Sequence, residues 1–360
     1  MTKFHALTLL VGLLVLGMVV SGGCGLPPDT PPPDGPAGEA ADGAPEVRDV
    51  SMRLQWFPQY QFAGYLVAKV RGYYDEAGLK VSIFPGSPDF VPLPLVVSGS
   101  DTFGSTGADT ILLARQKGIE VVALATIFQT SPVGFMVHRG SGIEQPQDFV
   151  GRTVGVFYGD NVETEYRALL SATGVDRAAL NEVPAQFNME PFLSRRVDVW
   201  PVYMTDQPDL ARRSGAEVDL IVARDYGVVL MGDVLFASEA FVREHPAAAQ
   251  AFVSATLRGW EYAVTYQNEA VSLIAEYDPQ LSLEHLKFEA TETINLVRYG
   301  AGERCLGWSD RETWEAEQQQ LLDLGLLEAP VAFDVAVDNR FVAEYHRRQG
   351  KTCGEPESPE

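Results

Sequence analysis

The chain has 360 residues, of which 49 are acidic and 27 basic, so its formal net charge is −22 at neutral pH. This charge argues against nucleic acid or an anionic lipid surface as the partner, because both would repel the protein. The acidity suits a soluble, exported protein. About 300 residues remain after both ends are set aside, which is enough for two domains of ordinary size.

Residues 1–23 resemble a lipoprotein signal peptide. Lys3 gives a weakly basic start, and the apolar run 7–20 is short for a spanning helix. Ser21-Gly-Gly-Cys24 resembles a lipobox, which implies Cys24 as the lipidated first residue of the mature protein and as its attachment to the membrane. The alternative is an uncleaved membrane anchor with an incidental cysteine. Either way, we expect the bulk of the chain outside the cytoplasm.

The segment 24–47 is rich in proline and has too few apolar side chains for a core, so we expect a semi-stiff tether. After it, β-rich apolar runs alternate with amphipathic runs. The first set predicts strands at 52–56, 80–84, 102–105, 121–128 and 134–138. It predicts helices at 64–77, 91–98 and 109–117, and Gly78 ends the first of them.

A second set begins near residue 153. It predicts strands at 153–157, 181–183, 198–202 and 219–222, with helices at 162–172, 189–195 and 207–214. An apolar run, 228–236, follows. The remainder predicts helices at 238–244, 247–268, 268–277, 283–296, 310–324 and 338–347, with a tail at 348–360. Strands that alternate with helices indicate an α/β fold with βαβ units and parallel sheets.

An ordered series of motifs resembles the NMT1/THI5-like group of solute-binding proteins. The motifs are Leu54–Tyr65, Gly72-Tyr-Tyr-Asp-Glu-Ala-Gly-Leu79, Pro85-Gly-Ser-Pro-Asp89, Phe103–Asp109, Ser141-Gly-Ile143, Asp225-Tyr-Gly227 and Asp233–Phe236. The resemblance implies the type II periplasmic-binding-protein fold, in which two α/β lobes joined by a two-strand hinge close on a ligand. Lobe 1 would comprise 48–136 and 233–347, and lobe 2 would comprise 137–232. The implied partners are a small-molecule ligand and the permease and ATPase of an ABC importer, with the protein acting as a monomer.

Polar and aromatic side chains follow four predicted strands, where ligands bind in open α/β sheets. The candidate ligand-binding residues are Trp56, Phe57, Gln59, Tyr60, Thr106, Asp109, Tyr158, Asn161, Glu163, Tyr203 and Tyr226. Trp56 and Tyr158 could stack on a flat ligand from opposite sides, and Gln59 offers an amide donor and acceptor. Thr106, Asp109, Asn161 and Glu163 could instead cap helices, and Trp56 could be a core residue.

The ligand that these side chains suit best is a small aromatic heterocycle, a thiamine pyrimidine precursor of the hydroxymethylpyrimidine type, with riboflavin as the alternative. Basic residues near the expected cleft are few, which counts against a sulfonate or phosphate. A ligand-sensing domain and a pyrimidine-synthase-like enzyme are alternatives of other classes. The synthases that the group resembles carry a cysteine-rich motif that this chain lacks, so we expect no enzyme activity.

The sequence contains no HExxH, Cys-x-x-Cys, P-loop or Gly-x-Ser-x-Gly motif, so we expect neither a metal nor a cofactor. Cys305 and Cys353 remain in the body. In an oxidising compartment they could pair and tie the C-terminal tail to the body, although their separation in sequence does not decide it.

Overall fold

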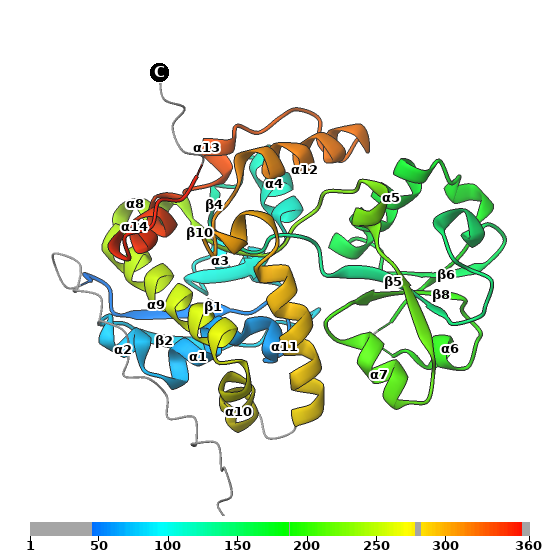
Figure 1. Cartoon of the computed structure of the whole chain (residues 1–360). Helices are drawn as coiled ribbons and strands as arrows, with labels where there is room; N and C mark the ends of the chain where they lie inside the picture. The colour runs from blue at the N-terminus through cyan, green and yellow to red at the C-terminus, as the bar shows by residue number, and fades with distance from the viewer. Residues whose placement is uncertain (1–44, 187, 278–281, 355–360) are drawn as a thin grey trace, which may run out of the picture. The chain divides into compact units, whose positions relative to one another are not determined.

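Two five-stranded sheets organise the computed structural model, which describes residues 45–186, 188–277 and 282–354. The predicted signal peptide, Cys24 and nearly all of the predicted tether lie outside the described residues. The first sheet has the order β2-β1-β3-β10-β4 and the second has the order β7-β6-β8-β5-β9. Figure 1 labels β1, β2, β4 and β10 of the first sheet and β5, β6 and β8 of the second. We call residues 45–128 and 232–354 the first lobe and residues 133–221 the second lobe.

The first sheet is parallel except for one strand. It contains β1 (Asp49–Arg53), β2 (Lys80–Phe84), β3 (Phe103–Thr106), β4 (Val121–Phe128) and β10 (Gly232–Ser238). Strand β10 runs antiparallel to both β3 and β4, with Val234 opposite Thr106 and Gly232 opposite Phe128. The start of β10 therefore lies at the carboxyl ends of β3 and β4, where ligands bind in α/β sheets.

The second sheet repeats this plan. Its strands are β5 (Val133–His138), β6 (Thr153–Val156), β7 (Asn181–Pro184), β8 (Val199–Tyr203) and β9 (Val218–Ile221). Strand β5 runs antiparallel to β8 and β9. The chain therefore crosses between the sheets twice, at 129–132 and at 222–231. The boundary expected after residue 136 falls inside β5, because all of 133–138 belongs to the second sheet.

Side chains alternate between the two faces of each sheet, as the period of a strand requires. In β5, Val133, Phe135 and Val137 pack in one apolar cluster with α5 (Asn161–Thr173), and Met136 packs in another with Trp200. In β10, Leu235 joins the cluster around α1 (Ala63–Val70) and α9 (Pro246–Thr265), whereas Phe236 joins the cluster around α4 (Ala108–Gln116) and α12 (Arg311–Asp323). Both faces of each sheet are thus covered, which explains the continuous apolar runs of β4 and β5.

The helices largely match the predicted ranges. Those of the first lobe are α1 (Ala63–Val70), α2 (Tyr73–Glu76), α3 (Pro92–Val97), α4 (Ala108–Gln116), α8 (Glu239–Glu244), α9 (Pro246–Thr265), α10 (Gln267–Tyr277), α11 (Leu283–Val297), α12 (Arg311–Asp323), α13 (Phe333–Ala336) and α14 (Arg340–Arg348). Those of the second lobe are α5 (Asn161–Thr173), α6 (Glu190–Leu193) and α7 (Gln207–Arg213). The helix expected at 64–77 is two helices, because Gly72 adopts a left-handed φ of 74° between them.

Within the part of the chain that the structure describes, no helix has both the length and the apolar character needed to cross a membrane. The two cysteines of the body form a disulfide, Cys305–Cys353, with Cα atoms 5.8 Å apart. The pairing left open by the sequence is therefore present. It joins the segment before α12 to the residues after α14.

Helices α1 and α9 cross at two glycines. A Cβ on Gly64 would lie 2.0 Å from Cδ1 of Trp260, and a Cβ on Gly259 would lie 2.1 Å from the carbonyl oxygen of Gly64. Trp260 is fully buried, so its indole has little room to move. The two backbones approach this closely because neither helix carries a side chain at the crossing.

We expect Gly64→Ala to lower the free energy of unfolding by about 2–3 kcal/mol, the upper range for overpacking a rigid core. This loss of stability is measured by urea unfolding, with far-ultraviolet circular dichroism as the probe of folding. The double variant Gly64→Ala/Trp260→Leu should lose less than the sum of the two single variants, because the leucine leaves space for the new methyl group. Additive losses would show that the clash between residue 64 and Trp260 does not cause the loss of stability in Gly64→Ala.

Candidate functional site

Buried polar side chains from both lobes converge at the carboxyl ends of the strands. The first lobe contributes the loop after β1 (residues 54–62), the end of β3 with the start of α4 (residues 105–109), and the start of β10. The second lobe contributes the start of α5 and the end of β8. We call this group of side chains the interlobe cluster. Its buried polar members are Gln59, Gln61, Ser105, Thr106, Asp109, Thr164, Glu165, Thr205 and Asp233.

A tyrosine hydroxyl connects the two lobes within this cluster. The oxygen of Tyr203, at the end of β8, accepts hydrogen bonds from Nε2 of Gln55 at 3.1 Å and from Nδ2 of Asn161 at 2.9 Å. Gln55 lies in the first lobe and the other two residues lie in the second. The amide oxygen of Gln55 and the hydroxyl of Thr205 are buried and have no hydrogen-bond partner among the residues that the structure describes. Such atoms are expensive to leave unpaired, so they mark a place where a ligand can supply hydrogen bonds.

Asp233 lies at the centre of the cluster. It is 2% exposed, and both of its carboxylate oxygens accept from Nε2 of Gln61, at 3.1 and 2.9 Å. Its backbone has a φ of 44°, a region that aspartate tolerates better than most residues. Burial raises the pKa of Asp233 to about 7, against the opposing effect of the Gln61 hydrogen bond. Burial raises the pKa of the Tyr65 and Tyr203 hydroxyls, which lie on opposite lobes, and the nearby Asp233 carboxylate raises both further.

Further carboxyl groups make the cluster predominantly acidic. Burial raises the pKa of Asp109, that of Asp160 to about 6 and that of Glu165 to about 8. Glu165 accepts a hydrogen bond from the Ser131 hydroxyl in the first crossing. Glu317, which is fully buried, accepts from the Met231 backbone N–H at 2.8 Å in the second crossing. An acidic, partly dehydrated site favours a ligand with amino or cationic groups and disfavours an anion.

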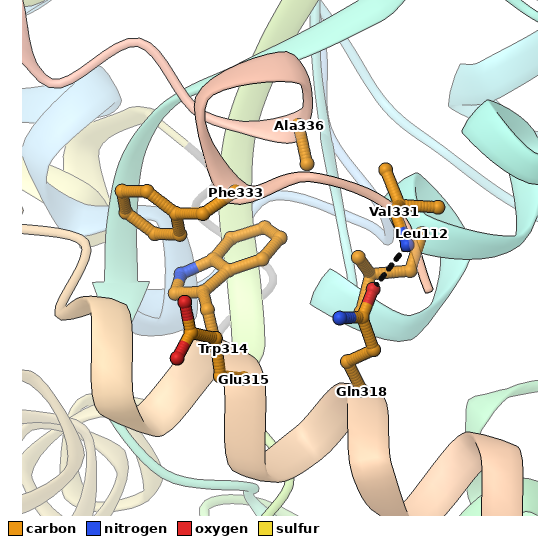
Figure 2. Close-up of a pocket in the computed structure, with 7 residues that line it drawn as sticks. All are labelled: Leu112, Trp314, Glu315, Gln318, Val331, Phe333 and Ala336. Atoms are coloured by element: carbon orange, nitrogen blue, oxygen red, sulfur yellow. Dashed lines mark hydrogen bonds between the residues drawn. The ribbon is translucent and has the colours of Figure 1, made fainter. Parts of the chain in front are cut away.

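A small hollow lies elsewhere in the first lobe. Figure 2 shows it between α4, α12 and the segment around α13, lined by Leu112, Trp314, Glu315, Gln318, Val331, Phe333 and Ala336. Oε1 of Gln318 accepts from the Val331 backbone N–H at 2.6 Å. The Trp314 ring lies edge-on to Phe333 at 6.4 Å. We assign this hollow to core packing, because most of its lining is apolar and the hydrogen bond between Gln318 and Val331 joins two segments of the lobe.

Comparison with known proteins identifies the fold and the family. The profile of the family described as NMT1/THI5 like matches residues 59–270. The chain belongs to the NMT1/THI5-like family. The riboflavin-binding protein RibY of Chloroflexus aurantiacus is 28% identical over 353 residues, which are 95% of this chain and 99% of that protein. The formylaminopyrimidine-binding protein of Halalkalibacterium halodurans is 27% identical over 81% of this chain and 89% of that protein.

A solved structure supports the architecture of this NMT1/THI5-like protein. The periplasmic aliphatic sulphonate binding protein SsuA from Escherichia coli superimposes with a TM-score of 0.63 at 15% identity, covering 87% of this chain and 96% of that one. The predicted type II periplasmic-binding-protein fold is therefore confirmed. Shorter sequence matches, over 64% and 65% of the chain, are to 4-amino-5-hydroxymethyl-2-methylpyrimidine phosphate synthases.

The structure brings several predicted site residues of this NMT1/THI5-like protein into the interlobe cluster. Thr106, Asp109, Asn161 and Tyr203 lie there, and Gln59 is 9% exposed and donates to Oε1 of Gln61 at 3.0 Å. None of the four residues with a capping alternative (Thr106, Asp109, Asn161 and Glu163) is itself an N-cap residue, because Gly107 is the N-cap of α4 and Asp160 is the N-cap of α5. Asp109 nevertheless accepts from the Thr110 backbone N–H at 2.7 Å, and Glu163 accepts from that of Gly159 at 2.7 Å, so both bind backbone groups at a helix start, as the capping alternative expected. Oδ1 of Asp160 accepts from the N–H groups of residues 162 and 163.

The predicted aromatic residues have different surroundings. Phe57 is 52% exposed, and the partly buried Trp56 packs edge-on against it at 5.3 Å. Tyr60 is fully buried and donates its hydroxyl to the Ala263 carbonyl at 2.9 Å, which gives it a core role. Tyr226 packs against the core of the second lobe.

Tyr158 and Glu163 belong to an ionic group near the edge strand β7. The Tyr158 hydroxyl donates to Glu182 at 3.0 Å, and Arg177 pairs with Glu163 at 2.9 Å and with Glu182 at 2.6 Å. Oε2 of Glu163 also accepts from the Gly159 backbone N–H at 2.7 Å. These bonds satisfy both side chains within the second lobe.

Sequence reasoning missed Asp233 within the cluster and Glu317 beside it. A signal for Asp233 was available, since it is the one charge in the apolar run Val228–Phe236. Aspartate is rarely buried unless it has a partner or a function. No comparable signal marks Glu317, which lies on a helix with several exposed carboxylates and is brought to the cluster only by the packing of α12.

Proposed function

We propose that this protein is the extracytoplasmic substrate-binding component of an ABC importer and captures a small amino-substituted aromatic heterocycle between its lobes. The observation that carries the proposal is the convergence of Asp233, Gln61 and Tyr203 in a buried site shared by the two lobes. The names of the two binding-protein relatives and the type II fold support the same role. Attachment to the membrane through Cys24 belongs to this proposal.

In this mechanism the two lobes open about the crossings 129–132 and 222–231 and close on the ligand. Opening separates Gln55 from Tyr203, which exposes both side chains to the entering molecule. On closure, the ionised Asp233 accepts from an amino group, and the amides of Gln55, Gln59 and Asn161 bond the edge of the heterocycle. The exposed ring of Phe57 stacks on it. The loaded protein then docks on a permease, which releases the ligand.

Among heterocycles we favour an aminopyrimidine of the thiamine-precursor type. Its amino group matches the carboxylates of the cluster, and the protein from Halalkalibacterium halodurans is named for a formylaminopyrimidine. Riboflavin is the second candidate, because the RibY match extends over 95% of the chain. SsuA is named for binding aliphatic sulphonates, which are anions. We do not propose a sulphonate ligand for this protein, because its cluster is acidic.

Thermal shift and calorimetric titration of the full chain with aminopyrimidines, thiamine, riboflavin and taurine test the proposal. We expect an aminopyrimidine to bind at micromolar concentration or tighter. We expect Phe57→Ala to weaken it about 2–10-fold, the range for a lost stacking contact. Tyr277→Ala, at an exposed ring at the end of α10, should leave the affinity unchanged.

Binding to riboflavin alone would select the second candidate. Binding to taurine alone would contradict the ligand class proposed here. If mass spectrometry shows that an aminopyrimidine incubated with the protein is converted to a product of different mass, the protein is instead an enzyme.

A further inference from the structure

Four ionisable side chains meet outside the interlobe cluster, at a second contact between the lobes. His285 and Glu289 lie one turn apart on α11 of the first lobe, and Asp206 and Asp209 lie at the start of α7 in the second lobe. Nε2 of His285 is 3.1 Å from Oδ1 of Asp206 and 3.7 Å from Oε1 of Glu289. These three atoms lie within 4.8 Å of one another.

Each of the three side chains has its other polar atom held by the protein. Nδ1 of His285 is 2.8 Å from Oδ2 of Asp209, and Oδ2 of Asp206 accepts from Nε2 of Gln207 at 2.6 Å. Oε2 of Glu289 accepts from the Tyr60 backbone N–H at 3.0 Å. Nε2 of His285, Oδ1 of Asp206 and Oε1 of Glu289 are therefore left to share one ion, which would replace the present contact between Nε2 and Oδ1. A carboxylate that orients a histidine in this way is typical of metal centres, because it fixes the tautomer and leaves Nε2 free to coordinate.

Burial supplies an independent reason to expect a ligand. The Glu289 side chain is fully buried, and its Oε1 has no hydrogen-bond partner within the described residues. The side chains of His285 and Asp206 are 10% and 15% exposed. An unpaired carboxylate oxygen in such surroundings is costly, and a cation at the common point would remove that cost.

The spacing fits a small divalent ion. Bonds of about 2.0–2.1 Å in tetrahedral geometry separate ligand atoms by roughly 3.3 Å, and the two distances from Nε2 fall on either side of that value. One imidazole and two carboxylates form a donor set of the kind that binds zinc and neighbouring transition metals. Two negative charges and a neutral imidazole would also balance a charge of +2.

We propose that Asp206, His285 and Glu289 bind a divalent transition-metal ion of the zinc class, with a fourth position open to water or ligand. Because Asp206 belongs to one lobe and the other two residues to the other, the ion holds the lobes together. Tyr60 adjoins Gln59 and Gln61, and Asp206 follows Thr205, so two segments of the interlobe cluster also hold the metal site. The ion thus strengthens ligand binding, and the ligand strengthens metal binding by the same factor.

Zinc titration of the untagged full chain, treated with a chelator and then dialysed, tests the proposal. Reductant is left out so that Cys305 and Cys353 stay paired and offer no thiolate. We expect one bound zinc per chain by calorimetry and elemental analysis. Glu289→Gln keeps the volume and an acceptor for Tyr60 but removes the coordinating charge, so we expect zinc affinity to fall at least 100-fold.

Glu284→Gln is the matched control, because this carboxylate is on the same helix, is 77% exposed and pairs only with Arg213 among the described contacts. It should bind zinc as the wild type does. Asp209→Asn should weaken zinc binding about 10–100-fold without removing a ligand atom. Circular dichroism and the melting temperature verify that each variant is folded.

Failure of the folded wild type to bind stoichiometric zinc would overturn the proposal, and the cluster would then be an ion pair of a protonated histidine. Equal losses in Glu284→Gln and Glu289→Gln would overturn it as well. Neither result bears on whether the protein binds a heterocycle, which is measured separately with chelator present.

Discussion

Asp233→Asn is expected to weaken binding of an aminopyrimidine about 10–100-fold while making the protein itself more stable at pH 8. The affinity falls because the variant loses a charge-assisted hydrogen bond, worth about 1.5–3 kcal/mol, to the ligand amino group. Asparagine is close in shape, tolerates the positive φ of this position and can still accept from Gln61. Function and stability therefore change in opposite directions.

The gain in stability follows from the raised pKa of Asp233, which burial moves to about 7. An unfolded aspartate has a pKa near 3.9, so between about pH 4 and pH 7 the folded state binds more protons than the unfolded state. Stability therefore falls as the pH rises through this window, and the full cost is present above pH 7. Removing the carboxylate should recover a few kcal/mol at pH 8 and almost nothing near pH 4.

Chemical denaturation and ligand titration of both proteins at pH 5.5, 7 and 8 measure these effects. Titration of the ligand itself changes both affinities equally, so it does not affect the ratio of the wild-type affinity to the variant affinity. This ratio should rise with pH as Asp233 ionises. Asp49→Asn, at an exposed carboxylate on β1, should change neither quantity. A variant that binds as tightly as the wild type at pH 8 would place the ligand away from Asp233.

Among the changes that affect stability but not ligand binding, removal of the disulfide is expected to have the largest effect. The bond between Cys305 and Cys353 spans 48 residues, a segment that includes α12, α13 and α14. Closing a loop of this length in the unfolded chain corresponds to about 4 kcal/mol of stabilisation in the chain-entropy account. The segment also carries Glu317 and Gln320, which hold the second crossing through Met231 and Val229.

We therefore expect Cys305→Ala/Cys353→Ser to lower the free energy of unfolding by up to about 4 kcal/mol, measured by urea unfolding. Reduction of the wild type with dithiothreitol should reproduce the loss, whereas dithiothreitol should have no effect on the double variant. If reduction leaves the wild-type midpoint unchanged, the C-terminal segment is held by its packing and the bond adds little.

Much of the fold could be predicted from the sequence, because strands and helices follow local apolar periodicity. The strands Lys80–Phe84 and Val121–Phe128 have the predicted bounds, and the other predicted strands shift by one to three residues, whereas β10 was expected only as part of the apolar run 228–236. The short helix α13 was missed, since four residues are too few for a periodic signal. The site was predicted in part: Tyr203, Asn161 and Asp109 follow strands and lie in the cluster, whereas Tyr60 follows a strand and points into the core.

The sequence by itself determined the α/β class, the order of the elements and, through an ordered series of motifs, the family. These depend on patterns within a few residues of one another. Only the tertiary structure decided that β5 and β10 enter their sheets antiparallel and that Asp233 meets Gln61, 172 residues earlier in the chain. It also decided that Asp206 meets His285. Contacts at such separations depend on how the sheets and crossings bring distant segments together, and local periodicity carries no information about that.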